Sequence, residues 1–228
     1  MATIASKLQL VQNRILQACS TVGRAPDSVK LLAVSKTFPA VTVREAFAAG
    51  QRCFGENYVQ EAIDKIEALA DLRSQIEWHL IGPLQSNKTR VVAEHFDWVH
   101  TVDRLKVAQR LNDQRPAGLP PLQICIQVNT SAEDSKSGIE PEHAAELADA
   151  VAQLPRLRLR GLMALPAPSE DPAVQHAALR QVRALFDTLQ QRNPALDTLS
   201  MGMSADLEAA VEEGATMVRI GTAIFGHR

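Results

Sequence analysis

Hydrophobic and polar positions along the chain change their spacing after the first twenty-odd residues. Apolar residues first recur every three or four positions, at Ile4, Leu8, Val11 and Ile15. This spacing predicts a helix with one buried stripe, which ends before Gly23. From there on, short apolar runs alternate with longer amphipathic stretches.

The short apolar runs have the length of strands. Strands are predicted at 29–34, 52–55, 77–81, 98–101, 122–128, 157–163, 198–201 and 217–220. Helices are predicted at 43–49, 57–73, 86–95, 103–113, 141–153, 172–192 and 205–213. Eight alternating units favour an α/β fold, a single (β/α)8 TIM-type barrel with an extra N-terminal helix. A doubly wound open sheet is the alternative, because the pattern alone does not show closure.

The length of 228 residues suits one domain, predicted to span 1–228. Two proline-rich stretches, 113–121 and 166–168, are predicted to be loops rather than linkers. The net charge of −2 provides no basic surface for nucleic acid or for anionic lipid. Nucleic acid and membrane are therefore not expected partners.

Cysteine and histidine spacings give no indication of a metal site. Cys19, Cys53 and Cys125 are far apart and form no CxxC pair, and the six histidines show no HxxxH spacing.

Lys7 and Arg14 interrupt the N-terminal segment, so it does not resemble a signal peptide, and no apolar run is long enough to cross a bilayer. We expect a cytoplasmic protein.

Polar residues gather at the predicted carboxyl ends of the strands, where barrel enzymes carry their chemistry. Lys36 follows an apolar strand and precedes Pro39. A lysine in this position can be partly desolvated, which favours the neutral amine that attacks carbonyl groups. The alternative is a lysine that extends from the strand end into solvent.

The loops after the seventh and eighth strands have small residues. Barrels often bind phosphate between these two loops, which here contain Gly202 with Ser204 and Gly221 with Thr222. Ser204 is equally explained as the cap of the following helix. Arg219 is predicted to face the barrel interior, either toward a bound pyridine ring or in a salt bridge, for example to Glu56.

Three further features have simpler explanations. His79 is expected to be a satisfied barrel residue, and Tyr58 a packing residue at a helix start. The polar segment 134–138 is expected to be a solvated loop.

Several stretches together resemble the YggS/PROSC family of pyridoxal 5′-phosphate (PLP) homeostasis proteins, which are related to the N-terminal barrel of alanine racemase. The resemblance covers nearly the whole chain, and its matching stretches are LLAVSKTFP (31–39), FGENYVQEA (54–62), EWHLIGPLQSNK (77–88), HTVDRL (100–105), NTSAEDSKSG (129–138), RGLMALP (160–166), LSMGMSADLEAAV (199–211) and MVRIGTAIFG (217–226).

The resemblance implies one bound PLP and a role for each residue that matches a motif. Lys36 would form the Schiff base, and Arg219 would face the pyridine nitrogen. Asn57 would lie beside the ring. The phosphate would be held by Ser200, Ser204, Gly221 and Thr222. Lys88 and Lys136 also match family positions and are otherwise explained as solvated charges.

The resemblance further implies binding and delivery of PLP rather than turnover. A racemase takes its second base from a β-rich domain that this chain is expected to lack, and an arginine at the pyridine nitrogen weakens the ring as an electron sink. We expect a monomer that maintains B6 vitamer and amino-acid homeostasis and that passes PLP to apoenzymes. A slow PLP-dependent racemase and a Schiff-base aldolase without PLP are the alternatives.

Overall fold

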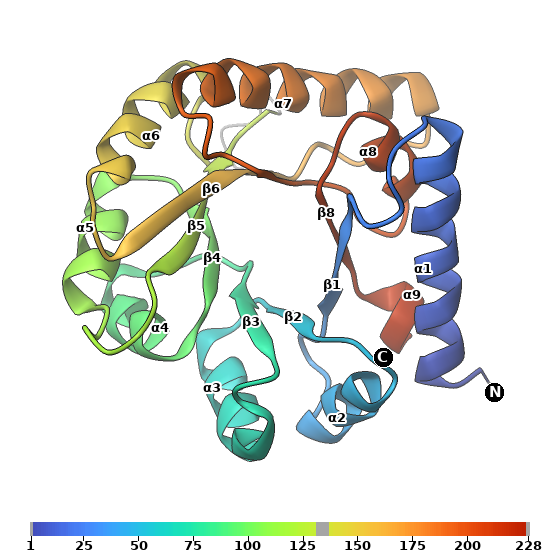
Figure 1. Ribbon diagram of the computed structural model, residues 1–228, viewed down its shortest axis with the longest axis horizontal. Helices are drawn as coiled ribbons and strands as arrows, with labels where there is room; N and C mark the ends of the chain where they lie inside the picture. The colour runs from blue at the N-terminus through green and yellow to red at the C-terminus, as the bar shows by residue number, and fades with distance from the viewer. Residues whose placement is uncertain (1, 131–136, 227–228) are drawn as a thin grey trace.

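The computed structural model describes residues 2–130 and 137–226. Eight parallel strands close into one barrel in the order β1-β2-β3-β4-β5-β6-β7-β8, and helices surround it (Figure 1). The barrel closes where β1 pairs with β8, with Ala33 opposite Ile220. The predicted (β/α)8 barrel is confirmed, and the open sheet is excluded.

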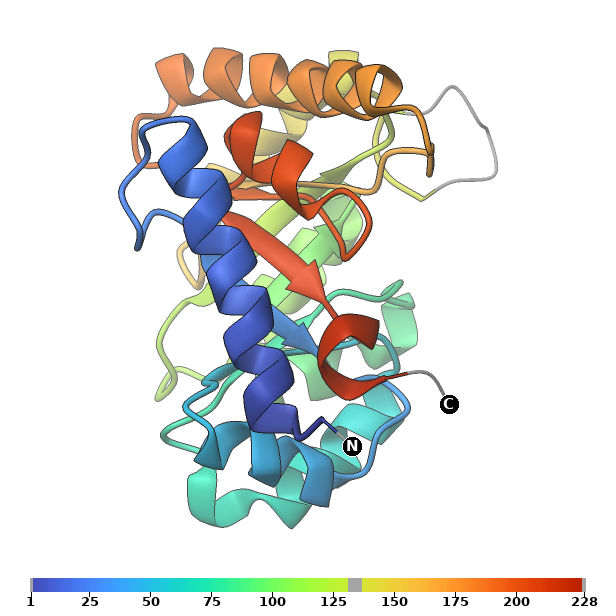
Figure 2. The ribbon, with the colours of Figure 1, turned by 90° about the vertical axis from the view of Figure 1, so that its right-hand side faces the viewer.

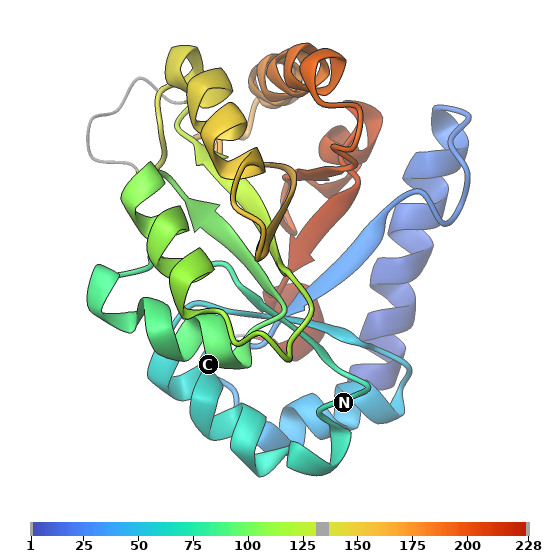
Figure 3. The ribbon, with the colours of Figure 1, turned by 60° about the vertical axis from the view of Figure 1, so that its left-hand side comes forward.

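The strands lie close to their predicted positions. They are β1 (Lys30–Val34), β2 (Cys53–Glu56), β3 (Glu77–Leu80), β4 (Trp98–Val102), β5 (Leu122–Val128), β6 (Leu157–Ala164), β7 (Thr198–Ser200) and β8 (Met217–Ile220). They enclose the barrel interior, with α4, α5 and α6 on the outside of one side (Figure 3).

The helices differ from prediction mainly at their ends. They are α1 (Ile4–Thr21), α2 (Ala40–Ala48), α3 (Val59–Ala68), α4 (Thr89–His95), α5 (Leu105–Gln114), α6 (Ala144–Ala152), α7 (Pro172–Arg192), α8 (Leu207–Glu212) and α9 (Thr222–Phe225). Three of the stretches predicted as longer helices contain a single 3-10 turn. These turns are η1 (Ala70–Leu72), η2 (Ser86–Lys88) and η3 (Pro141–His143). Among the described residues, no helix has the length and apolar character needed to cross a membrane.

The extra N-terminal helix α1 is present, with Leu8, Val11 and Ile15 buried as its spacing predicts. It packs against α8 and α9, on the outside of the seam between β1 and β8 (Figure 2). Thr3 begins the helix, and its side-chain oxygen accepts a hydrogen bond from the Ser6 N–H. The helix thus covers the side of the barrel where the first and last strands meet.

Side chains along each strand alternate between the barrel interior and the surrounding helices. The outward set belongs to the main apolar core, for example Val218 and Ile220 on β8. The inward set includes a small apolar cluster of Trp98, Cys125 and Met163. Polar side chains that also point inward lie beside this cluster. They form a hydrogen-bonded row that runs between the two ends of the barrel.

Candidate cofactor-binding site

Lys36 lies two residues beyond the end of β1, in the turn that leads to α2. Its side chain is exposed. The side chain therefore reaches solvent from the strand end.

The turn that contains Lys36 lies beside the loop after β8. A Cβ atom at Gly221 would lie 3.2 Å from the backbone oxygen of Val34, so the strand ends approach each other where residue 221 has no side chain. Lys36 and Thr222 therefore emerge from adjacent strand ends, although 186 positions separate them in the sequence.

The loops after β7 and β8 meet, as predicted. The Ser204 and Thr222 hydroxyl oxygens are 3.5 Å apart. Gly202 has a φ of +93°, and a Cβ there would lie 2.4 Å from the Ala210 side chain. Asp206 is the N-cap residue of α8, and its carboxylate accepts the Met203 N–H at 2.6 Å. The capping interpretation of Ser204 is therefore wrong, and its hydroxyl is directed to the Thr222 side instead.

Arg219 lies inside the barrel and is only 4% exposed. One guanidinium nitrogen donates to Ser200 Oγ at 2.8 Å, and the other to the Ala164 backbone oxygen at 2.8 Å. Burial lowers the pKa of Arg219 to about 10, so the side chain stays charged at neutral pH. Glu56 is not its partner, which excludes the salt bridge considered from the sequence, because the Glu56 carboxylate pairs with Lys65.

Ser200 begins a row of hydrogen bonds through the barrel interior. His100 Nδ1 lies 3.0 Å from Ser200 Oγ, and His100 Nε2 lies 2.9 Å from His79 Nδ1. His79 Nε2 lies 2.9 Å from Glu77 Oε1, which also accepts from Lys30 Nζ at 3.1 Å. The row thus joins Arg219 at the carboxyl end of the strands to Lys30 at the amino end.

The charged ends of the row fix the direction of each hydrogen bond. Burial opposes ionisation of Glu77, but the contacts of its carboxylate with His79 and Lys30 hold its pKa below the ordinary value. A carboxylate only accepts hydrogen bonds, so His79 donates from Nε2, and burial keeps both imidazoles neutral by lowering their pKa values. His79 Nδ1 then accepts from His100 Nε2, and His100 Nδ1 accepts the Ser200 hydroxyl proton.

This direction gives Ser200 a role inside the barrel, beside the phosphate contact implied by the resemblance. Its hydroxyl oxygen accepts from Arg219, and its proton is donated to His100. In this arrangement the hydroxyl orients the Arg219 guanidinium. Phosphate contact stays a prediction for Ser200, Ser204, Gly221 and Thr222.

Asn57 is half-buried directly after β2. It lines a cavity of about 460 Å³ at the carboxyl end of the strands, together with Ile81, Thr101, Gln127 and Met203. The chain passes so close here that a Cβ at Gly82 would lie 2.0 Å from the Asn57 backbone oxygen. The position of Asn57 is therefore compatible with its predicted place beside a bound ring.

Three further residues were considered from the sequence: Lys88, Lys136 and Tyr58. Lys88 is half-buried at the end of η2. Lys136 lies outside the described residues, as does most of the 134–138 segment. Tyr58 is 58% exposed, so the interpretation of Tyr58 as a packing residue is wrong.

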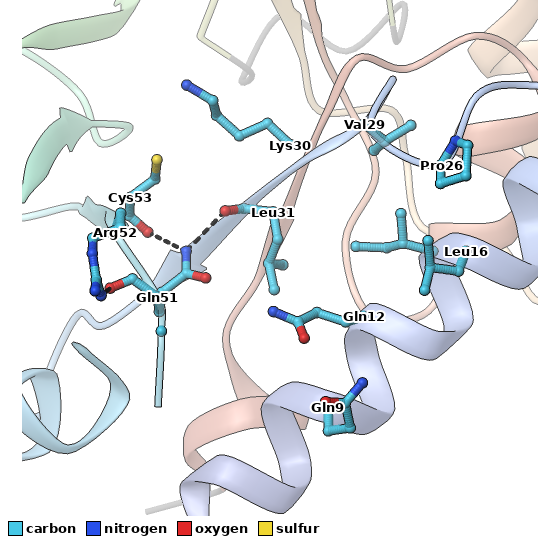
Figure 4. A pocket seen from close by; sticks show the side chains of 12 residues that line it. Gln9, Gln12, Leu16, Pro26, Val29, Lys30, Leu31, Gln51, Arg52 and Cys53 are labelled. Atoms are coloured by element: carbon cyan, nitrogen blue, oxygen red, sulfur yellow. Dashed lines mark hydrogen bonds between the residues drawn. The ribbon is translucent and has the colours of Figure 1, made fainter. Parts of the chain in front are cut away.

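A separate cavity of about 380 Å³ lies between α1 and the start of β1 and β2. Figure 4 shows Gln51 beside it, donating to the backbone oxygens of Leu31 and Cys53 at 2.9 and 2.7 Å. None of the predicted site residues lines this cavity.

All three cysteines are free thiols, and burial raises the pKa of Cys53 and of Cys125 to about 12.

His79 is a satisfied barrel residue, as predicted, but its partners and a second polar set on α3 were missed from the sequence. His100 shares an inward face with Trp98, and His79 with Glu77, so alternation along two neighbouring strands was the available signal. Lys65 and Glu61 lie on α3 beneath the Lys36 turn, and Lys65 is a buried lysine on an apolar helix face. That second feature was the signal for a buried ion pair.

The comparisons with known proteins agree with this geometry. The model of the alanine racemase N-terminal domain matches residues 7–228. A pyridoxal phosphate homeostasis protein of Pseudomonas aeruginosa is 63% identical over 228 residues, covering 100% of this chain and 97% of the relative. That of Escherichia coli is 59% identical over 229 residues, covering 100% of this chain and 98% of the relative.

Solved structures give the same result. PipY of Synechococcus elongatus, with PLP bound, is 42% identical with a TM-score of 0.84, covering 98% of this chain and 100% of PipY. An unknown protein from Bifidobacterium adolescentis is 35% identical with a TM-score of 0.91, covering 97% of this chain and 94% of that chain. Alanine racemase of Clostridium difficile, at 14% identity and a TM-score of 0.75, shares the fold; this chain covers 57% of it. The chain belongs to the family of pyridoxal phosphate homeostasis proteins, built on the alanine racemase N-terminal domain.

Proposed function

We propose that this protein binds PLP through a Schiff base on Lys36 and carries or buffers it, without turning over an amino-acid substrate. Its relatives are named for PLP homeostasis, and PipY holds PLP in a closely similar structure. PLP would supply an aldehyde for the Lys36 amine and a phosphate for the neighbouring loops.

The observation that carries the proposal is the contact between the ends of β1 and β8. Gly221 lies against Val34, and the Ser204 and Thr222 hydroxyls are 3.5 Å apart, which supports a site shared by the exposed Lys36 and these two hydroxyls. An amine and two hydroxyls in one site would suit the aldehyde and the phosphate of PLP, respectively. A lysine amine attacks an aldehyde carbon, and the exposed side chain of Lys36 is accessible to it.

Arg219 supports a carrier rather than a catalyst. A guanidinium donates hydrogen bonds but does not accept them, so it fits the lone pair of a pyridine nitrogen. Ser200 and the Ala164 carbonyl hold it in the barrel interior. A charged donor at that nitrogen disfavours protonation of the ring, which weakens it as a sink for carbanion electrons.

Delivery to apoenzymes is the proposed use of the bound PLP. The exposure of Lys36 supports this, because an acceptor amine can reach the Schiff base from solvent. We place the protein in the cytoplasm as a monomer that takes part in B6 vitamer and amino-acid homeostasis. Three free thiols, two of them buried, support a reducing compartment.

The visible absorbance of the purified protein tests the proposal, with Lys36→Ala and Lys88→Ala side by side. We expect PLP to give a visible band in the native protein and in Lys88→Ala, and none in Lys36→Ala. Retention of the α-deuterium of labelled amino acids by the loaded protein is the second expectation. A colourless native protein after PLP addition contradicts binding, and loss of α-deuterium contradicts the carrier role.

A further inference from the structure

One buried ion-pair cluster lies directly beneath the turn that contains Lys36. It consists of Glu56 on β2 with Glu61 and Lys65 on α3. Lys65 Nζ lies 2.8 and 2.9 Å from the two Glu56 carboxylate oxygens and 2.6 Å from Glu61 Oε1. The side chains of Glu56 and Lys65 are 0% and 5% exposed, whereas that of Glu61 is 31% exposed.

This cluster holds the residue before Lys36 by two of its groups. The Ser35 hydroxyl donates to Glu56 Oε1 at 2.6 Å. The Ser35 backbone oxygen accepts from Lys65 Nζ at 2.7 Å. A side-chain contact and a backbone contact together fix both the position and the orientation of this peptide unit.

The same cluster holds the residue after Lys36. The Thr37 N–H donates to Glu61 Oε1 at 2.5 Å. Thr37 has a φ of +69°, and it is the one non-glycine residue with a positive φ in the part of the chain that the structure describes. A β-branched residue avoids this conformation, so an anionic acceptor at its N–H stabilises an otherwise unfavourable turn.

We infer that Glu61, with Lys65 and Glu56, positions Lys36 for the cofactor by fixing the backbone on both of its sides. The inference rests on the proposed function, since Lys36 is the proposed Schiff-base residue. The lysine side chain itself stays exposed and free to react, while Ser35 and Thr37 are tied down. Pre-organisation of this kind limits the conformations that the attached cofactor must give up on binding.

A purely structural role is the competing explanation, because a buried ion pair also joins α3 to the barrel wall. Replacing Lys65 leaves the buried Glu56 charge unpaired, so a Lys65 variant does not separate the two explanations. Glu61 does separate them, because its carboxylate is partly exposed and Lys65 keeps Glu56 as its partner when Glu61 is removed.

The test uses Glu61→Ala and Glu61→Gln, with Asp64→Ala as the matched control. Asp64 and Glu61 both line a surface cavity of about 600 Å³ beside Thr37, but the Asp64 carboxylate accepts a hydrogen bond from Gln60. Each PLP-loaded protein is mixed with an excess of a free amine that traps PLP, and the decay of the visible band gives the release rate.

We expect release from Glu61→Ala to be about tenfold faster than from the native protein, and Asp64→Ala to stay within about twofold. Glu61→Gln retains an oxygen acceptor for the Thr37 N–H, so it should recover part of the native rate. Hydrogen exchange of the Thr37 amide should accelerate in Glu61→Ala, even without PLP.

Native release rates and native Thr37 exchange in a folded Glu61→Ala protein would overturn the inference. An equal acceleration in Asp64→Ala would also overturn it, because the effect would then reflect surface charge. The proposed function fails separately, if the native protein itself forms no visible band with PLP.

Discussion

Two buried polar networks lie behind the proposed PLP site, and they use opposite means to stabilise buried polarity. Beneath Lys36, Glu56 and Lys65 form a direct ion pair between the barrel wall and α3. Behind Arg219, the row through Ser200, His100 and His79 separates the charges by neutral groups. The first network holds backbone, and the second holds a side chain.

The difference reflects what Lys36 and Arg219 each require in the proposed site. A Schiff-base lysine must move and react, so the fixed part is the peptide on either side of it. The Arg219 guanidinium must stay charged and point in one direction, so the fixed part is its hydrogen-bond geometry. Burial raises the pKa of Glu56 and lowers the pKa values of His79 and His100, so desolvation favours the neutral form in both networks.

Loss of the lysine in the ion-pair network should have the largest effect. Lys65→Met leaves the buried Glu56 carboxylate without its counter-ion, and we expect a loss of about 3–5 kcal/mol in the free energy of unfolding. Urea denaturation measures it. The double variant Glu56→Gln with Lys65→Met should recover part of this loss, whereas a double variant as unstable as the single one contradicts the ion-pair account.

Acid should act mainly on the histidine row. Burial lowers the pKa values of His79 and His100 in the folded protein, so protonation favours the unfolded chain. The contribution of these neutral side chains to the free energy of unfolding is therefore fully present above about pH 6.5 and is lost as pH falls. The expected loss between pH 7 and pH 5 is up to about 2 kcal/mol for each histidine. The pKa of Glu77 is also lowered in the folded protein. Its contribution to stability is therefore present above the ordinary pKa of a carboxyl group and is lost only as pH falls below that value.

Urea denaturation across this pH range measures the effect. The double variant His79→Gln with His100→Gln should flatten the dependence above pH 5. A profile that stays as steep in the double variant shows that other groups are responsible.

A single break in the row should cost less than a broken ion pair. His100→Leu removes the acceptor of the Ser200 proton and the donor to His79, for which we expect a loss of about 1–3 kcal/mol. His143, which is exposed, provides the control, and His143→Gln should change stability by less than about 0.5 kcal/mol. Equal losses in both variants contradict a structural row.

The smallest effect on stability is expected at the phosphate loops. Thr222 is exposed, so Thr222→Val should change the free energy of unfolding by less than about 0.5 kcal/mol. The affinity of this variant for PLP should fall about tenfold to a hundredfold, the value of one hydrogen bond to a charged group. Equilibrium titration of the visible band measures it, and an unchanged affinity removes Thr222 from the phosphate site.

The architecture could be predicted from sequence because it depends on local patterns. The period of α1 and the alternation of strands with helices are properties of neighbouring residues, and each was confirmed. The meeting of Ser204 with Thr222 followed from the order of strands in a barrel, since consecutive parallel strands end at the same face.

The pairing of residues within the two buried networks could not be predicted, because it depends on strand register and on how α3 packs against the barrel. His79 and His100 meet because β3 and β4 pair with His79 opposite Trp98, and a shift of one residue would direct His100 away from the interior. Glu56 was considered as a partner for Arg219. Its partner is instead Lys65, nine residues later on α3; the apolar helix face around Lys65 indicates a buried partner but does not identify Glu56.

Chemical identification of the PLP attachment site tests the central claim most directly. The PLP-loaded protein is reduced with borohydride and digested, and the peptides are weighed by mass spectrometry. The account predicts one major pyridoxyl adduct, on Lys36. An adduct on Lys65 or Lys88 in place of Lys36, or none on any lysine, would contradict it.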